Sequence, residues 1–98
     1  MVKNSRTPSR LDAIRSLNPP RRINVEARAN PRGISRPLTV IDGGRRVDVA
    51  RIDDFWRIDD EWWFRPIARH YYRVAFTDGR TGTIYHDLIT GIWHTQHY

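Results

Sequence analysis

The chain has 98 residues, no cysteine and a formal net charge of +6 at pH 7. This length allows one small domain, and the lack of cysteine excludes disulfide bonds and thiolate metal sites. No apolar run approaches the ~20 residues that span a bilayer, and no apolar segment follows the basic N-terminus as in a secretory signal peptide. We therefore expect a cytoplasmic protein without a membrane role, whose positive charge suits an anionic partner.

Charge and aromatic residues divide the chain into two parts. Residues 1–36 hold nine basic residues and two acids, whereas residues 37–98 hold eight arginines and nine acids. All of the Phe, Trp and Tyr residues lie beyond position 54. A segment without aromatic residues buries too little apolar surface to offset the entropy cost of ordering it. The composition therefore predicts a flexible arginine-rich arm over residues 1–36 and a folded domain over residues 37–98.

One part of the arm, residues 9–18, has the pattern of a short helix. Leu11, Ile14 and Leu17 recur every three residues, which places them on roughly one face, and a Pro-Pro pair follows. An isolated helix of this length is marginal in water. The segment is therefore either a fraying turn or a helix that forms when it docks on a partner or on its own domain.

From residue 37 onward the apolar residues follow the period of two that is typical of strands. A short strand over 38–41 and a longer one over 45–52 flank a tight glycine turn at 43–44. A further β stretch runs over 55–58, and we expect the acids at 59–61 to interrupt it.

The strongest hairpin signal lies in the second half of the domain. Two alternating segments, 71–77 and 81–86, flank an Asp-Gly pair, which is the dipeptide most typical of a hairpin turn. A turn over 87–91 and a last strand over 92–96 follow. The predicted fold is mostly β: an antiparallel meander or an SH3-like, partly open barrel of about five strands.

Residue types that carry catalysis are present but are not arranged as a site. The four serines fall in the predicted arm, where no base can be held beside them. The acids at 53–54 and 59–61 fit turn caps and ion pairs to arginine, and the histidines lack the spacing of a metal site. We therefore predict no enzyme activity, no metal, no cofactor and no small-molecule substrate.

Basic residues beside aromatic rings are the remaining signal. Single-strand nucleic-acid readers stack bases on such rings and follow phosphates with arginine, although the same rings also suit core packing. An arginine-rich genome is an equally good explanation of the arginine bias. The candidates for nucleic-acid contact are Arg21, Arg22, Arg28, Arg32 and Arg73. The candidates for contact with a protein partner are Leu11, Ile14, Leu17, Trp62, Tyr71 and Tyr85.

The order of motifs in the second half also resembles a known family. The segments 56–63, 66–74 and 84–93, with Asp78-Gly79 between the last two, follow the pattern W-R-I-D-D-E-W-W, Y-Y-R-V, D-G and Y-x-D-L-x-x-G-x-W. This pattern is similar to a small bacterial domain of unknown function. Similar segments are appended to the C-terminal end of catalytically inactive Y-family polymerase homologues (the ImuB type) of the damage-induced mutagenesis system. The chain departs from the pattern at Phe64, His70 and His86, where arginine is common in the family.

The resemblance covers about residues 37–95 and implies a non-catalytic β module associated with bacterial DNA repair or translesion synthesis. It implies contact with proteins of that machinery, and the basic arm adds the expectation of contact with DNA. The alternative is a structural or assembly adaptor that docks through its N-terminal helix and binds no nucleic acid. The oligomeric state is left open.

Overall fold

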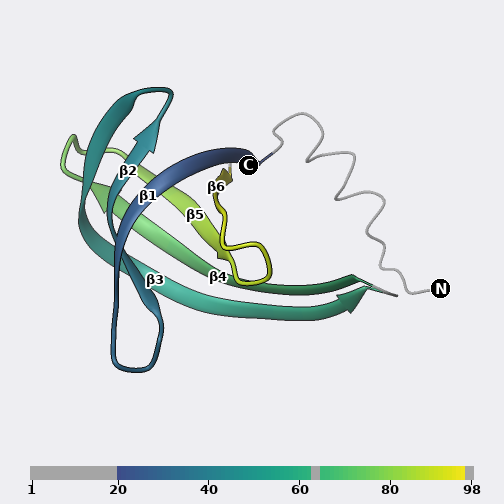
Figure 1. Cartoon of the computed structure of the whole chain (residues 1–98). Coiled ribbons are helices and arrows are strands. Elements are labelled where there is room, and N and C mark those ends of the chain that lie inside the picture. The colour runs from purple at the N-terminus through teal and green to yellow at the C-terminus, as the bar shows by residue number, and fades with distance from the viewer. Residues whose placement is uncertain (1–19, 63–64, 97–98) are drawn as a thin grey trace.

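The computed structural model of the chain describes residues 20–62 and 65–96, without the side chains of 61, 62 and 65. The helix predicted over 9–18 lies outside the described residues. Six strands occur in chain order, and each pairs antiparallel with the next (Figure 1). Strand β1 then pairs with β6 and closes the barrel. The strands are β1 (Arg21–Ala29), β2 (Ser35–Asp42), β3 (Arg45–Trp62), β4 (Arg65–Phe76), β5 (Thr81–Asp87) and β6 (Trp93–Gln96).

The predicted all-β antiparallel meander is confirmed, as a closed barrel of six strands. The predicted boundary between arm and domain at residue 37 is wrong, because β1 and the turn after it belong to the barrel. Ile23 and Val25 alternate with polar residues along β1 and pack in or against the core. Ser35, which was assigned to the arm, begins β2.

A tight turn over residues 30–34 joins β1 to β2. The side-chain oxygen of Asn30 accepts hydrogen bonds from the backbone N–H groups of Arg32 (2.9 Å) and Ile34 (3.0 Å). Gly33 takes a φ of 82°, which glycine adopts without steric cost. The proline and glycine of this segment therefore belong to a hairpin of the barrel, and the segment is not part of a flexible arm.

Strand β3 is long and bent. Its first residues pair with β2, and from Val49 onward it pairs with β4, with register shifts before Arg51 and before Asp54. These bulges bend β3, which pairs with β2 along its first residues and with β4 along the rest. The expected interruption at residues 59–61 does not occur, because these acids pair with β4 in regular register. The β3–β4 hairpin thus extends well past the barrel, as the β1–β2 hairpin does in another direction (Figure 1).

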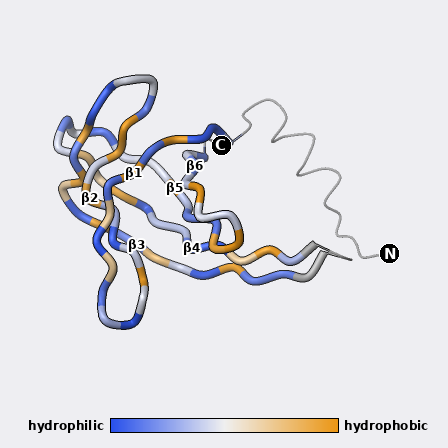
Figure 2. Tube along the Cα trace, viewed as in Figure 1, coloured by the Kyte–Doolittle hydropathy of each residue, from blue (hydrophilic) through white to orange (hydrophobic). Residues whose placement is uncertain are grey.

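The barrel interior is filled by side chains from all six strands, with Val49 and Ile52 of β3 packed against the buried cluster. Figure 2 shows the apolar residues alternating with polar ones along these strands. The centroid of the Tyr72 ring lies 5.4 Å from the ring centroid of Trp93 and 5.1 Å from that of Phe55. Large aromatic rings supply the burial that so small a domain needs. The buried core residues are Ile23, Val40, Tyr72, Val74, Ile84 and Trp93.

Tyr72 also makes a polar contact that crosses the interior. Its hydroxyl donates a hydrogen bond to the backbone carbonyl of Ser35, at the start of β2. Burial raises the pKa of Tyr72 to about 12, so the hydroxyl stays protonated and remains a donor. This bond joins β4 to β2, which do not neighbour each other in the sheet.

Replacing Tyr72 with phenylalanine should lower the free energy of unfolding by about 1–2 kcal/mol, because the carbonyl of Ser35 loses its partner. Urea denaturation measures this change. Tyr71→Phe is the matched control. The hydroxyl of Tyr71 accepts a hydrogen bond from the side chain of Arg69 at 3.1 Å, and its removal should lower the free energy of unfolding by only about 0.5 kcal/mol. Equal stability of Tyr72→Phe and the wild-type chain would contradict a structural role for this bond.

Candidate functional site

The structure places the five arginines predicted to contact nucleic acid on two strands and a turn of the barrel. Arg21, Arg22 and Arg28 lie on β1, Arg32 lies in the turn after it, and Arg73 lies on β4. They are not brought together in one patch. Arg21 lies at one end of β1, whereas Arg28 and Arg32 lie at the far end of the β1–β2 hairpin.

Three arginines gather on this hairpin without a counter-charge. Arg28 and Arg36 are directly opposite each other across β1 and β2, and Arg32 lies in the turn between them. All three are exposed, and none forms an ion pair with a carboxylate of residues 20–60 or 66–96, the range of described side chains. Like charges directly opposite each other destabilise a strand pair. We call Arg28, Arg32 and Arg36 the arginine hairpin, and its tip is hydrophilic in Figure 2.

The arginines elsewhere in the barrel are mostly paired. Arg46 donates two hydrogen bonds, of 3.0 and 2.7 Å, to the carboxylate of Glu26. These bonds lower the pKa of Glu26 and raise the pKa of Arg46. Further pairs join Arg21 to Asp42, Arg51 to Asp53 and Arg57 to Asp59.

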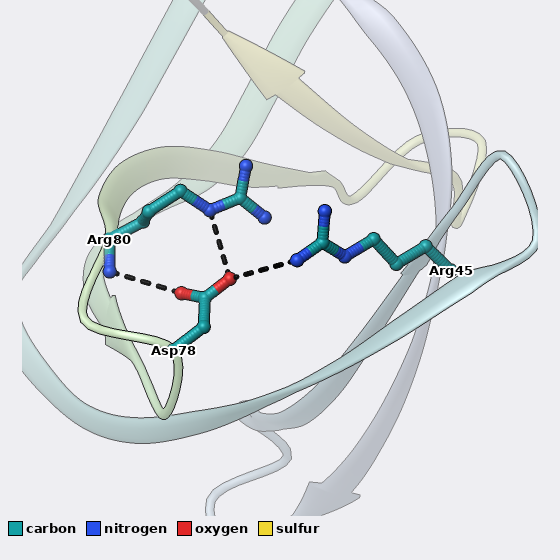
Figure 3. A network of polar contacts seen from close by, with 3 residues as sticks. All are labelled: Arg45, Asp78 and Arg80. Carbon is teal, nitrogen blue, oxygen red and sulfur yellow. Dashed lines mark hydrogen bonds and ion pairs between the residues drawn. The ribbon is translucent and has the colours of Figure 1, made fainter.

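One carboxylate serves two arginines in the network of Figure 3. Asp78 accepts hydrogen bonds from the Nε of Arg80 at 2.9 Å and from Arg45 at 3.5 Å. The hydrogen bonds to the backbone and side chain of Arg80 lower the pKa of Asp78. Among the paired arginines, positive charge is thus largely neutralised, which leaves the arginine hairpin as a local excess.

The folded domain is more basic than residues 37–98, the range predicted for it, because those residues hold eight arginines and nine acids. From Arg21 to Gln96 the sequence holds thirteen arginines and ten carboxylates, a formal net charge of +3. The shift from near neutrality comes from residues 21–36, which bring five further arginines and one glutamate into the barrel.

A hollow of about 280 Å³ opens at one end of the barrel. Its walls include Val40, Phe76 and Ile84, with Arg21, Arg45 and Arg80 around them. These arginines are already paired with Asp42 and Asp78. The hollow therefore carries less unbalanced positive charge than the arginine hairpin.

The predicted partner-binding residues have different outcomes. Leu11, Ile14 and Leu17 lie outside the described residues, and so does the side chain of Trp62, whose backbone ends β3. Tyr71 and Tyr85 are only 6% and 3% exposed. The interpretation of these two tyrosines as an exposed surface patch is therefore wrong.

Tyr71 and Tyr85 belong to a row of rings that crosses four strands. Trp56 pairs with Tyr71, Tyr71 with Tyr85, and Tyr85 with His94, each directly opposite the next. Ring centroids are 5.4, 5.0 and 4.8 Å apart along this row. The guanidinium carbon of Arg69 lies 4.5 Å from the centroid of the Tyr85 ring. Cross-strand packing therefore uses the very rings that sequence reasoning assigned to a partner.

Histidine and acid side chains do not form a metal site in the part of the chain that the structure describes, where no group of three potential ligands occurs. His70 and His86 are directly opposite each other, and His86 stacks on Trp93 at a centroid distance of 4.4 Å. Burial lowers the pKa values of His70, His86 and His94. Each has a buried Nδ1 without a hydrogen-bond partner, which favours the neutral ring.

Arg36 is the functional candidate that sequence reasoning missed. It was counted with the arm, and nothing in a disordered arm places it opposite Arg28. The signal that could have found it is the turn chemistry of Asn30, Pro31 and Gly33, which predicts a hairpin and hence this register.

Comparisons with protein-family models, with curated proteins and with solved structures found no match. The resemblance to the family of small bacterial domains thus stays a prediction. Over the described ranges there is also no helix long and apolar enough to cross a membrane.

The buried histidines predict a loss of stability in mild acid. In the unfolded chain histidine gains a proton near pH 6.5, whereas in the folded chain the lowered pKa values delay this gain. Stability should therefore be full above pH 7 and fall as the pH drops from 7 to 5. The lowered pKa values of Glu26 and Asp78 act only at more acidic pH.

Urea titrations at several pH values measure this dependence. The single variants His70→Gln, His86→Gln and His94→Gln should each flatten the curve, because each removes one group that the unfolded state protonates first. A wild-type stability that is constant or rises between pH 7 and 5 would contradict the neutral, buried state of these rings.

Proposed function

We propose that this chain is a non-catalytic accessory module that binds duplex DNA through the arginine hairpin. The observation that supports the proposal most strongly is the direct opposition of Arg28 and Arg36, with Arg32 between them and no ion pair to a described carboxylate at any of the three. Such an arrangement costs stability in the free protein, and an anion that bridges the guanidinium groups removes that cost.

The shape of the hairpin suits this partner. A two-stranded β ribbon fits into the major groove of B-DNA, where phosphates line both sides. Arginine forms paired hydrogen bonds to phosphate more readily than lysine does. The turn is held by the side chain of Asn30, so the backbone that carries the three arginines loses little freedom on binding.

The chemistry favours contact with the phosphate backbone over reading of sequence. Bases of a single strand need exposed rings on which to stack, and Tyr71 and Tyr85 are buried. The expected binding is therefore electrostatic, weakly specific and strongly dependent on salt. The accessory role in DNA repair and the contact with proteins of that machinery rest on the sequence resemblance, and we retain both as part of the proposal.

The proposal is tested by titrating the full chain with a short DNA duplex at two salt concentrations. Substituting Arg28, Arg32 and Arg36 together with glutamine should weaken binding about tenfold or more at low salt. It should also reduce the slope of log affinity against log salt by about 2–3, because up to three phosphate contacts are lost.

A charge-matched control is available in Arg46, Arg51 and Arg57, which are exposed but paired with carboxylates. Substituting these three with glutamine changes the net charge equally and should alter affinity less than the hairpin variant does. Equal losses in both variants mean that binding follows net charge, and the hairpin is then not the site. Absence of DNA binding by the wild-type chain favours the adaptor alternative.

A further inference from the structure

The hollow at one end of the barrel is lined by the last inward-facing residue of each strand. Asp42, Phe76 and Gly82 each lie two residues from a core residue of the same strand, and residues two apart in a strand face the same side. The others are directly opposite residues that face inward. The six residues are Arg21, Asp42, Arg45, Phe76, Gly82 and Thr95, and all of them line the hollow.

Gly82 contributes to the hollow because it has no side chain. Of the six glycines in the chain, it alone lacks a positive φ, so the backbone conformation does not require glycine at this position. It pairs with Val74 without a register shift. Among the described residues, a Cβ atom built here would approach only the ring of Phe76, at an ordinary 3.6 Å. A glycine in a regular strand weakens it and is typical of a site that another group approaches closely.

The hollow joins an apolar interior to a basic opening. The core residues Val40 and Ile84 line it together with Phe76, so its deep part is apolar. Three arginines line it as well, and their side chains are more than half exposed. Their ion pairs reach two carboxylates, those of Asp42 and Asp78. One guanidinium charge is therefore not balanced within this cluster.

Arg45 is the arginine of the hollow that is held least firmly. Among the described residues, its side chain makes one hydrogen bond, from Nη2 to Asp78 at 3.5 Å (Figure 3). The same carboxylate accepts from the Nε of Arg80 at 2.9 Å, and Arg21 donates two hydrogen bonds to its own partner. A guanidinium group has five N–H donors. Most of those of Arg45 are thus left for another acceptor.

We propose that the hollow binds a small organic acid, whose fused rings enter the space beside Gly82 and whose carboxylate pairs with Arg45. The size fits, because a cavity of about 150 Å³ holds benzene and this hollow, of about 280 Å³, has room for roughly two rings. One carboxylate supplies the negative charge that the cluster lacks, and arginine binds carboxylates through paired hydrogen bonds.

The position in the fold is a common one for ligands, since small molecules often bind in the mouths of β barrels. The inference is one of binding and adds no catalytic step. It does not depend on DNA binding by the arginine hairpin, which lies on other residues.

Titration of the full chain with naphthoate, followed through the NMR signals of its methyl groups, tests the site. Binding should saturate at one molecule per chain, with a Kd of about 1 mM or tighter. The methyl groups of Val47 and Ile84, which line the hollow, should shift. The neutral naphthamide should bind about tenfold more weakly, because it lacks the charge that pairs with Arg45.

Two variants separate the apolar and the charged parts of the site. Gly82→Leu should fold, because the backbone accepts a side chain there, and should abolish saturable binding by filling the hollow. Arg45→Gln should weaken naphthoate binding about tenfold and leave naphthamide unchanged. Arg46→Gln is the matched control: Arg46 is the next residue, pairs with Glu26 and does not line the hollow, so naphthoate binding should be unchanged.

Four results overturn the proposal. Naphthoate that does not bind the wild-type chain shows that the hollow takes no such ligand. Equal shifts of the exposed residues Ile58 and Ile89 show non-specific adsorption, and this readout needs no variant to fold. Unchanged binding by a folded Gly82→Leu variant places the ligand elsewhere. Equal losses in Arg45→Gln and Arg46→Gln show a response to net charge alone.

Discussion

The pairing of β1 with β6 is the constraint on which the rest of the structure depends. Among the described residues, three pairs join the two strands: Arg21 with Thr95, Arg22 with His94, and Ile23 with Trp93. Ile23 and Trp93 are both core residues, so closure of the sheet and filling of the core are achieved by the same contact. Closure also removes the open edges that β1 and β6 would otherwise present to other chains.

This closure converts part of a basic segment into a rigid hairpin. Because β1 is held by β6 at one end and by β2 along its length, Arg28 and Arg36 are kept opposite each other despite their repulsion. Most of the other arginines whose side chains the structure describes are paired, and local conflicts of this kind concentrate at functional sites. The arginine hairpin therefore stands out by its lack of partners more than by its charge alone. The barrel supplies the stability, and the projecting hairpin is the surface that we propose for a partner.

Turn chemistry allowed much of the fold to be predicted, and averaged composition caused the main error. The glycine pair after Asp42 and the Asp-Gly pair after Thr77 each define a hairpin locally, and both were predicted correctly. Strand β1 was missed because its short apolar pattern lies within a segment judged by its charge and its lack of rings. Its stability comes from distant partners in β2 and β6, which no local pattern reveals. The burial of Tyr71 and Tyr85 depends in the same way on strands far along the chain.

Amide hydrogen exchange along β1, measured by NMR on the full chain, tests the role of this closure most directly. If β1 closes the barrel, its hydrogen-bonded amides should exchange with the same opening free energy as those of Val74 and Ile84 in the core. Fast exchange throughout β1, with β4 and β5 still protected, would show an open sheet with a loose basic segment. The arginine hairpin would then have no rigid base.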